Sequence, residues 1–177
     1  IMGVAFDAGV PMIEAIGLAL VTGTVCGLIN GIILVKFPEL SSMIVTLATQ
    51  IIFRGIAQII LETNSVGGFP SWFTQIAAGK IDEMVPYALI FVIFEALFFA
   101  YLLHYTKFGR RCYAMGNSTT VAKFSGVKTG KIKVIVYTMT GLLSAVAAIY
   151  LASKMSSVRP DVAKGYELDI IAMAVLG

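Results

Sequence analysis

Four apolar stretches dominate the sequence and restrict it to one kind of fold. They cover approximately residues 12–35, 43–61, 85–105 and 132–152. A hydrocarbon core about 30 Å thick is crossed by about 20 mostly apolar residues in helical form. Apolar residues make up 58% of the 177 positions and charged residues only 13%, so much of the surface must face lipid. The sequence predicts an all-α, polytopic membrane bundle in which residues 1–177 form a single domain.

Both ends of the sequence indicate a piece of a longer protein. Residues 1–10 contain Asp7 and lack the basic region of a signal peptide. The apolar run at residues 170–177 is too short to span a membrane. We therefore expect a domain that is incomplete at both ends.

The cysteines and the histidine argue against two other classes of protein. Cys26 lies in an apolar stretch and Cys112 in a basic loop, which excludes a disulfide framework. His104 has no histidine or cysteine near it in the sequence, so zinc-ligand spacing is missing and a Ser/His/Asp arrangement has no clear members. We predict that this chain is not an enzyme and holds no metal.

Loop charges predict the orientation of the four spans. Loops rich in lysine and arginine stay on the cytoplasmic side. The loop at residues 106–131 has no acidic residue and carries these basic ones: Lys107, Arg110, Arg111, Lys123, Lys128 and Lys131. It is therefore expected to be cytoplasmic, together with residues 36–42, whereas residues 62–84 and the segment after Ala152 are expected outside.

Two of the spans carry small residues at helical spacing, which lets another backbone approach closely. The first span has Gly23, Gly27 and Gly31, and the fourth has Gly141, Ala145 and Ala148. These faces are expected to pack within one subunit, and the alternative is a dimer contact. Asn30 lies beside the glycine face, where its amide needs a hydrogen-bond partner.

The second span carries a polar stripe that cannot face lipid. Its members recur every four residues: Thr46, Gln50, Arg54 and Gln58. Glu95 is the other charge near mid-membrane, and Arg54 and Glu95 are at similar depth, so we hypothesise an ion pair between them. Separate polar neighbours or water are the alternative. With Asn30, the stripe and Glu95 are candidates for lining a solute path.

The cytoplasmic loop resembles a known family. The run FGRRCYAMGN, then VAKFSGV, TGLLSAVAAIYLASKMSS and GYELDIIAMAVLG closely resemble permeases of monosaccharide importers driven by ATP, including those for ribose, xylose, galactose, rhamnose and autoinducer-2. GLINGIILVKF and IVTLATQIIFRGIA are similar to earlier landmarks of the same family. The similarity covers nearly the whole chain in the family's order.

The resemblance implies a multi-pass subunit of the bacterial plasma (inner) membrane that forms the translocation path. It implies three partners: a second permease copy, cytoplasmic ATP-binding subunits and an extracytoplasmic sugar-binding protein, which residues 153–169 are candidates to contact. A coupling segment to the ATPase subunits maps onto these residues: Gly116, Asn117, Val121, Ala122, Ser125 and Gly126. A short helix over residues 120–124, capped by Ser118 or Thr119, is expected there.

No phosphate-binding loop motif is present, so ATP and Mg are expected on the partner and no cofactor on this chain. A secondary transporter, coupled to an ion gradient through Arg54 and Glu95, is a competing hypothesis. A membrane-embedded enzyme and a purely structural membrane subunit stay open as well.

Overall fold

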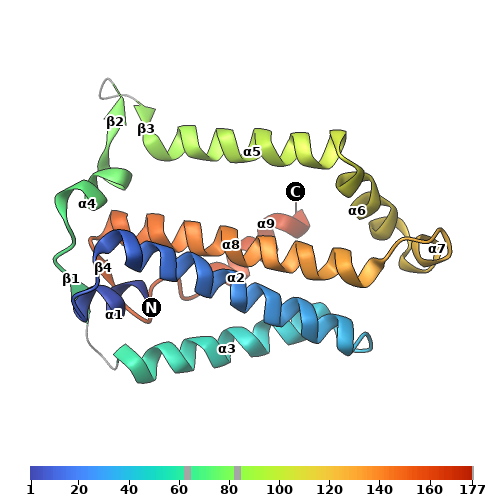
Figure 1. Ribbon diagram of the computed structural model, residues 1–177, viewed down its shortest axis with the longest axis horizontal. Coiled ribbons are helices and arrows are strands. Elements are labelled where there is room, and N and C mark those ends of the chain that lie inside the picture. The colour runs from blue at the N-terminus through green and yellow to red at the C-terminus, as the bar shows by residue number, and fades with distance from the viewer. Residues whose placement is uncertain (62–64, 82–84, 177) are drawn as a thin grey trace.

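The computed structural model describes residues 1–61, 65–81 and 85–176, and most of them are helical (Figure 1). The helices are α1 Met2–Asp7, α2 Met12–Lys36, α3 Ser42–Leu61, α4 Ser71–Ala78, α5 Tyr87–Tyr105, α6 Lys107–Asn117, α7 Thr119–Phe124, α8 Thr129–Met155 and α9 Tyr166–Leu176. Two short antiparallel pairs join β1 Val66–Gly67 to β4 Ser157–Val158 and β2 Lys80–Ile81 to β3 Val85–Pro86. The predicted all-α membrane bundle with four spans is confirmed, because α2, α3, α5 and α8 are each long and apolar enough to cross a bilayer.

The helix bounds differ from the apolar stretches where polar residues continue a helix. The helix α8 has 27 residues and runs three residues beyond the apolar stretch at each end. Thr129 and Ser153 are buried near those ends, so packing extends the helix past its apolar part. It stops where Ser156 adopts a left-handed conformation with φ 51°. The third span begins later than the apolar run, because Val85 and Pro86 form β3.

The cytoplasmic loop contains a helix that the sequence analysis did not predict. In addition to α7, which follows the expected capping by Ser118, the helix α6 occupies residues 107–117. The Thr106 hydroxyl caps it by accepting a hydrogen bond from the backbone N–H of Gly109, at 3.2 Å. Its first turns contain one glycine and three basic residues, so the apolar positions are few and their helical spacing is weak in the sequence.

The helices α2 and α8 pack closely along their small residues. A Cβ on Gly23 would lie 2.5 Å from the Cβ of Ala145, and one on Gly31 would lie 2.9 Å from the Cα of Val134. A Cβ on Gly27 would meet the carbonyl oxygen of Tyr137. The contact lies within one chain, and glycine is what allows the two backbones to approach.

An apolar cluster closes one end of the bundle. Met2, Met12, Phe69, Phe73 and Ala152 are buried there, and Phe69 contacts Phe73 edge-to-face at 5.4 Å. The buried Ser153 hydroxyl donates to the carbonyl oxygen of Phe73 at 2.6 Å and accepts from the N–H of Ala77 at 3.1 Å. This cluster ties α4 to the end of α8 and sets the outer boundary of the space between the helices.

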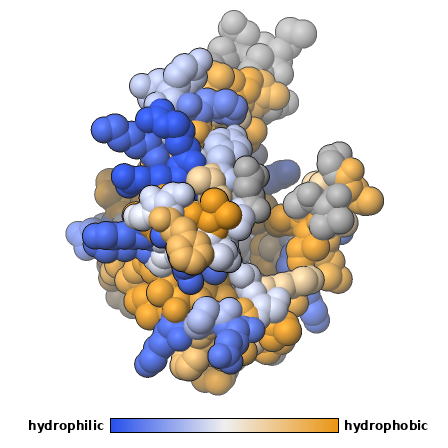
Figure 2. All heavy atoms as spheres, turned by 90° about the vertical axis from the view of Figure 1, so that its right-hand side faces the viewer, coloured by the Kyte–Doolittle hydropathy of each residue, from blue (hydrophilic) through white to orange (hydrophobic). Residues whose placement is uncertain are grey.

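The loops that were expected on opposite sides of the membrane lie at opposite ends of the bundle. Figure 1 places α4 and the β1–β4 pair at one end, and α6, α7 and the α2–α3 connection at the other. Figure 2 views the second end, where hydrophilic side chains gather beside apolar ones. The charge rule predicts that this end is cytoplasmic.

Candidate solute path and coupling segment

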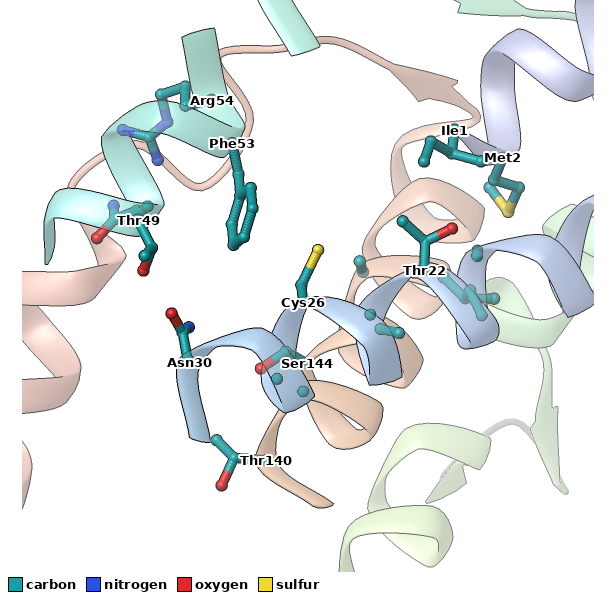
Figure 3. Close-up of a pocket in the computed structure, with 18 of the residues that line it drawn as sticks. Ile1, Met2, Thr22, Cys26, Asn30, Thr49, Phe53, Arg54, Thr140 and Ser144 are labelled. Carbon is teal, nitrogen blue, oxygen red and sulfur yellow. The ribbon is translucent and has the colours of Figure 1, made fainter. Parts of the chain in front are cut away.

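A cavity of about 690 Å³ opens between α1, α2, α3 and α8 (Figure 3). It extends from Val158 and Pro160 near the outer end of the bundle to Asn30 on α2. Its floor is the α2–α8 contact, where Gly23, Gly27 and Gly141 also line it. The small residues that let the helices touch therefore also leave room for the cavity, because no large side chain projects into it from this contact.

The cavity gathers four of the six residues that were candidates for a solute path. Asn30, Thr46, Gln50 and Arg54 line it. Gln58 is exposed and does not line it. Glu95 lies on α5, which is separated from α3 by α2 and α8 (Figure 1). Three members of the polar stripe, Thr46, Gln50 and Arg54, thus face the cavity, and the last member, Gln58, does not.

Asn30 has a buried acceptor atom without a partner. Its Oδ1 makes no hydrogen bond within the described part of the chain. Asn30 and Thr49 point toward one another from α2 and α3 (Figure 3). Thr49 does not satisfy Asn30, since its hydroxyl donates to the carbonyl oxygen of Val45 at 3.1 Å.

The other threonines of the cavity use their protons in the same way. Thr22 donates to Leu18 at 2.5 Å, Thr46 to Ser42 at 2.9 Å and Thr140 to Val136 at 3.0 Å, in each case to a backbone carbonyl one turn earlier. A hydroxyl has one proton and two lone pairs, so each of these side chains offers the cavity only an acceptor. Together with Asn30 Oδ1 they make a wall that can accept hydrogen bonds from a ligand.

The charged group of the cavity is an ion pair, although not the expected one. Arg54 Nη1 lies 3.7 Å from Glu167 Oε1 on α9, and both side chains are 26% exposed. The hypothesis of an Arg54–Glu95 pair is wrong, because α9 returns into the bundle and supplies the carboxylate while Glu95 stays on the far side of α2 and α8. The paired charges leave the lining close to neutral.

The position of Glu167 also corrects the predicted placement of residues 153–169. The end of α8 and β4 lie at the outer end, where Val158 also borders the cavity, whereas Glu167 reaches Arg54 on α3. Glu167 Oε2 accepts a hydrogen bond from the N–H of Gly165 at 3.0 Å, which stabilises the start of α9. Irregular backbone at membrane depth needs such protein or cavity neighbours, because lipid offers no hydrogen bonds.

The residues expected to form a coupling segment lie around α7, at the end of the bundle that Figure 2 views. Val121 is 63% exposed and Ala122 is 2% exposed, so adjacent residues have different roles: Val121 is available to a partner and Ala122 anchors the helix. Ser125 and Gly126 are exposed, and Gly126 ends the helix at φ 77°. Gly116, also exposed, and Asn117 close α6.

Several residues of the two sites were not predicted from the sequence. Phe124, 89% exposed, is the largest exposed apolar side chain on α7. In the cavity the additional lining residues include Thr22, Cys26, Phe53, Thr140 and Ser144. A signal existed for α2: Thr22, Cys26 and Asn30 each precede a glycine of the packing face, so they form a second stripe rotated by one residue.

One of the residues that were expected to pack between helices does not do so: Ala148 lines the cavity and is exposed.

Residues 1–177 match the family described as the permease component of branched-chain amino acid transport systems. The chain belongs to this permease family. Its curated relatives include the autoinducer 2 import system permease protein LsrD of Salmonella typhimurium, 34% identical over 99% of this chain. The protein of the same name from Yersinia pseudotuberculosis is 35% identical over 99% of this chain. Each alignment covers 54% of the relative, so the chain spans about half the length of the curated relatives it matches. No solved structure matches the chain.

The comparisons confirm the resemblance to importer permeases. Together with the four apolar helices, they make this permease chain a multi-pass inner-membrane protein. The cavity between α2, α3 and α8 therefore lies within a membrane permease chain.

Proposed function

We propose that this chain is part of the permease subunit of an ATP-driven importer of sugars or related polyols, and that the cavity between α2, α3 and α8 lies on the solute path. The observation that carries the proposal is the lining of that cavity. The Oδ1 of Asn30 has no donor among the described residues, and the hydroxyl protons of Thr22 and Thr140 are taken by backbone carbonyls. The arginine of the lining, Arg54, is paired with Glu167. A neutral molecule with several hydroxyl donors suits such a site.

The same lining argues against the solute that the family's description mentions. A zwitterionic amino acid needs an anionic and a cationic partner, and an isolated charge at membrane depth is costly. Arg54 and Glu167 already satisfy one another. A hydroxylated ring can donate to Asn30 and the threonines and place its apolar face on Phe53, which points into the cavity (Figure 3). We therefore favour a neutral polyol over a branched-chain amino acid.

The proposed partners follow from the cytoplasmic end. ATP-binding subunits would contact α7, where Val121 and Phe124 expose apolar surface to water. Such side chains are typical anchors for a partner. A movement of α7 would reach α8 through the short link at residues 125–128, and α8 forms one wall of the cavity. A second permease copy and an extracytoplasmic binding protein complete the proposed importer.

Cys26 provides the test of the solute path, because it lines the cavity (Figure 3). The full-length permease with Cys112→Ser is assembled with its ATPase subunits, and the alkylation rate of Cys26 by N-ethylmaleimide is measured with neutral monosaccharides and with leucine or isoleucine. We expect slowing by at least one neutral polyol and none by the amino acids. Slowing by leucine alone, or by no solute, would contradict the proposal.

ATP dependence is tested on the same preparation in sealed vesicles. Uptake that requires the ATPase subunits and ATP supports the importer. Uptake by the permease alone, driven by an ion gradient, would contradict it and favour a secondary transporter.

A further inference from the structure

The helix α6 has a strongly basic face that the solute path and the coupling segment do not use. Lys107, Arg110 and Arg111 are exposed on it. The other face carries Phe108, Cys112 and Met115, which are partly buried at spacings of four and three. A helix with one apolar and one basic face is typical of the membrane interface.

The length of α5 places the start of α6 at the level of the lipid headgroups. With 19 residues, α5 is about 28 Å long, close to the thickness of a hydrocarbon core. The helix α6 follows after the single residue Thr106. Arg110 and Arg111 lie in its first turns, so they stay close to the membrane surface, whereas α7 lies farther along the cytoplasmic end (Figure 1).

Aromatic side chains mark the same level. Tyr101 and Tyr105 are exposed and stacked with ring centroids 5.5 Å apart. The His104 ring meets the ring of Tyr113 edge-on at 6.1 Å, which joins the end of α5 to α6. Tyrosines concentrate where the hydrocarbon core meets the headgroups. The basic face therefore continues an interfacial belt.

The surrounding charge is one-sided. The sequence has no acidic residue between Glu95 and Asp161. Within the described part of the chain, none of the three basic side chains on α6 forms an ion pair. Arginine is suited to phosphate because its planar fork can donate two parallel hydrogen bonds.

We propose that Lys107, Arg110 and Arg111 bind the phosphate of an anionic phospholipid headgroup in the cytoplasmic leaflet. The neighbouring Tyr105 and Tyr113 border this site at the depth of the glycerol region. The lipid would fix the angle between α5 and α6, and so the position from which α7 reaches the ATPase subunits. This site is independent of the solute path.

The experiment measures lipid binding to the full-length permease by native mass spectrometry. Phosphatidylglycerol and phosphatidylcholine are titrated against the purified protein, its Arg110→Gln/Arg111→Gln variant and a matched Lys128→Gln/Lys131→Gln control, in which two exposed charges are removed from the same end. Each basic residue near the surface contributes about 1 kcal/mol to attraction of anionic lipid, so the arginine variant should lose roughly 30-fold in apparent affinity for phosphatidylglycerol. The control should lose much less.

Three results would overturn the proposal. Equal binding of the two lipids by the unaltered protein is one, and it needs no variant. Equal losses in the arginine variant and the lysine control would mean that only general charge attraction operates. If the arginine variant keeps its lipid but no longer co-purifies with its ATPase subunits, which the unaltered protein does, the basic face docks a protein instead. Should the glutamine variant fail to fold, Arg110→Lys/Arg111→Lys keeps the charge, and a loss of lipid affinity there still supports two-pronged phosphate binding.

Discussion

The guanidinium of Arg54 on α3 lies 3.7 Å from the carboxylate of Glu167 on α9, and Arg54 also lines the cavity that we assign to the solute path. The contact joins segments that the sequence separates by two complete spans. It also holds the start of α9 at membrane depth, since Glu167 accepts a hydrogen bond from Gly165 as well. Each charge is therefore partly neutralised by the other, although both side chains stay partly exposed.

Removing one member of this pair should therefore harm the protein more than removing both. Arg54→Gln or Glu167→Gln leaves a lone charge at the cavity, and an unpaired charge within the membrane is unfavourable. The double variant Arg54→Gln/Glu167→Gln should recover most of the thermal stability of the full-length protein in detergent. Arg54→Gln/Glu95→Gln is the matched control and should recover none. Recovery in that control would restore Glu95 as the partner.

The need for a partner of Arg54 could be predicted, but its identity could not. Depth along a helix follows from residue counting, and Glu95 fits by that measure. Azimuth does not follow from counting, because it depends on how the helices pack. Residues 159–165 return into the bundle, but their sequence has no apolar periodicity that would predict this. A count of loop charges therefore treats them as an outer loop and places Glu167 outside. Packing between Gly27 and Tyr137 was predictable in kind, since glycine spacing is a local property.

Gly27 provides a steric test of the α2–α8 contact. A Cβ there would meet the Tyr137 carbonyl oxygen, and backbone cannot move aside cheaply. Gly27→Ala should destabilise the full-length protein by about 1–3 kcal/mol, the usual cost of overpacking. Gly17→Ala on the same helix is the control, because a Cβ at Gly17 would meet nothing within 4 Å. Equal melting temperatures for the two variants would contradict the close contact.

Cys112 on α6 reports both orientation and environment. Burial raises the pKa of the Cys112 thiol above its ordinary value near 8.5. The thiolate is the reactive form, so a raised pKa means less thiolate at neutral pH and slower alkylation than for free glutathione. In a Cys26→Ser background, an impermeant maleimide should label inside-out vesicles only, with a rate that keeps rising above pH 8.5. Labelling of right-side-out vesicles would invert the topology.

Phe124 tests the coupling role of α7. Its side chain is 89% exposed, so Phe124→Ser removes no packing within the described chain and should leave the melting temperature of the permease unchanged. If Phe124 anchors an ATPase subunit, the variant should lose co-purifying ATPase and solute-stimulated ATP hydrolysis. Lys123→Ser, also exposed on α7, is the control. Normal coupling in Phe124→Ser would remove this residue from the proposed interface.

Substitutions of Asn30 should distinguish an effect on solute uptake from an effect on protein stability. Its Oδ1 is buried and unpartnered among the described residues, and such a group costs about 1–3 kcal/mol until a donor reaches it. Asn30→Leu removes that cost, so we expect the full-length protein to become as stable or more stable while solute uptake falls. Asn30→Asp keeps the shape but adds an unpaired charge, and both stability and uptake should fall. Melting temperature and uptake are measured on the same preparations. A destabilised Asn30→Leu protein would mean that another part of the full-length chain already donates to Oδ1, which would remove Asn30 from the solute path.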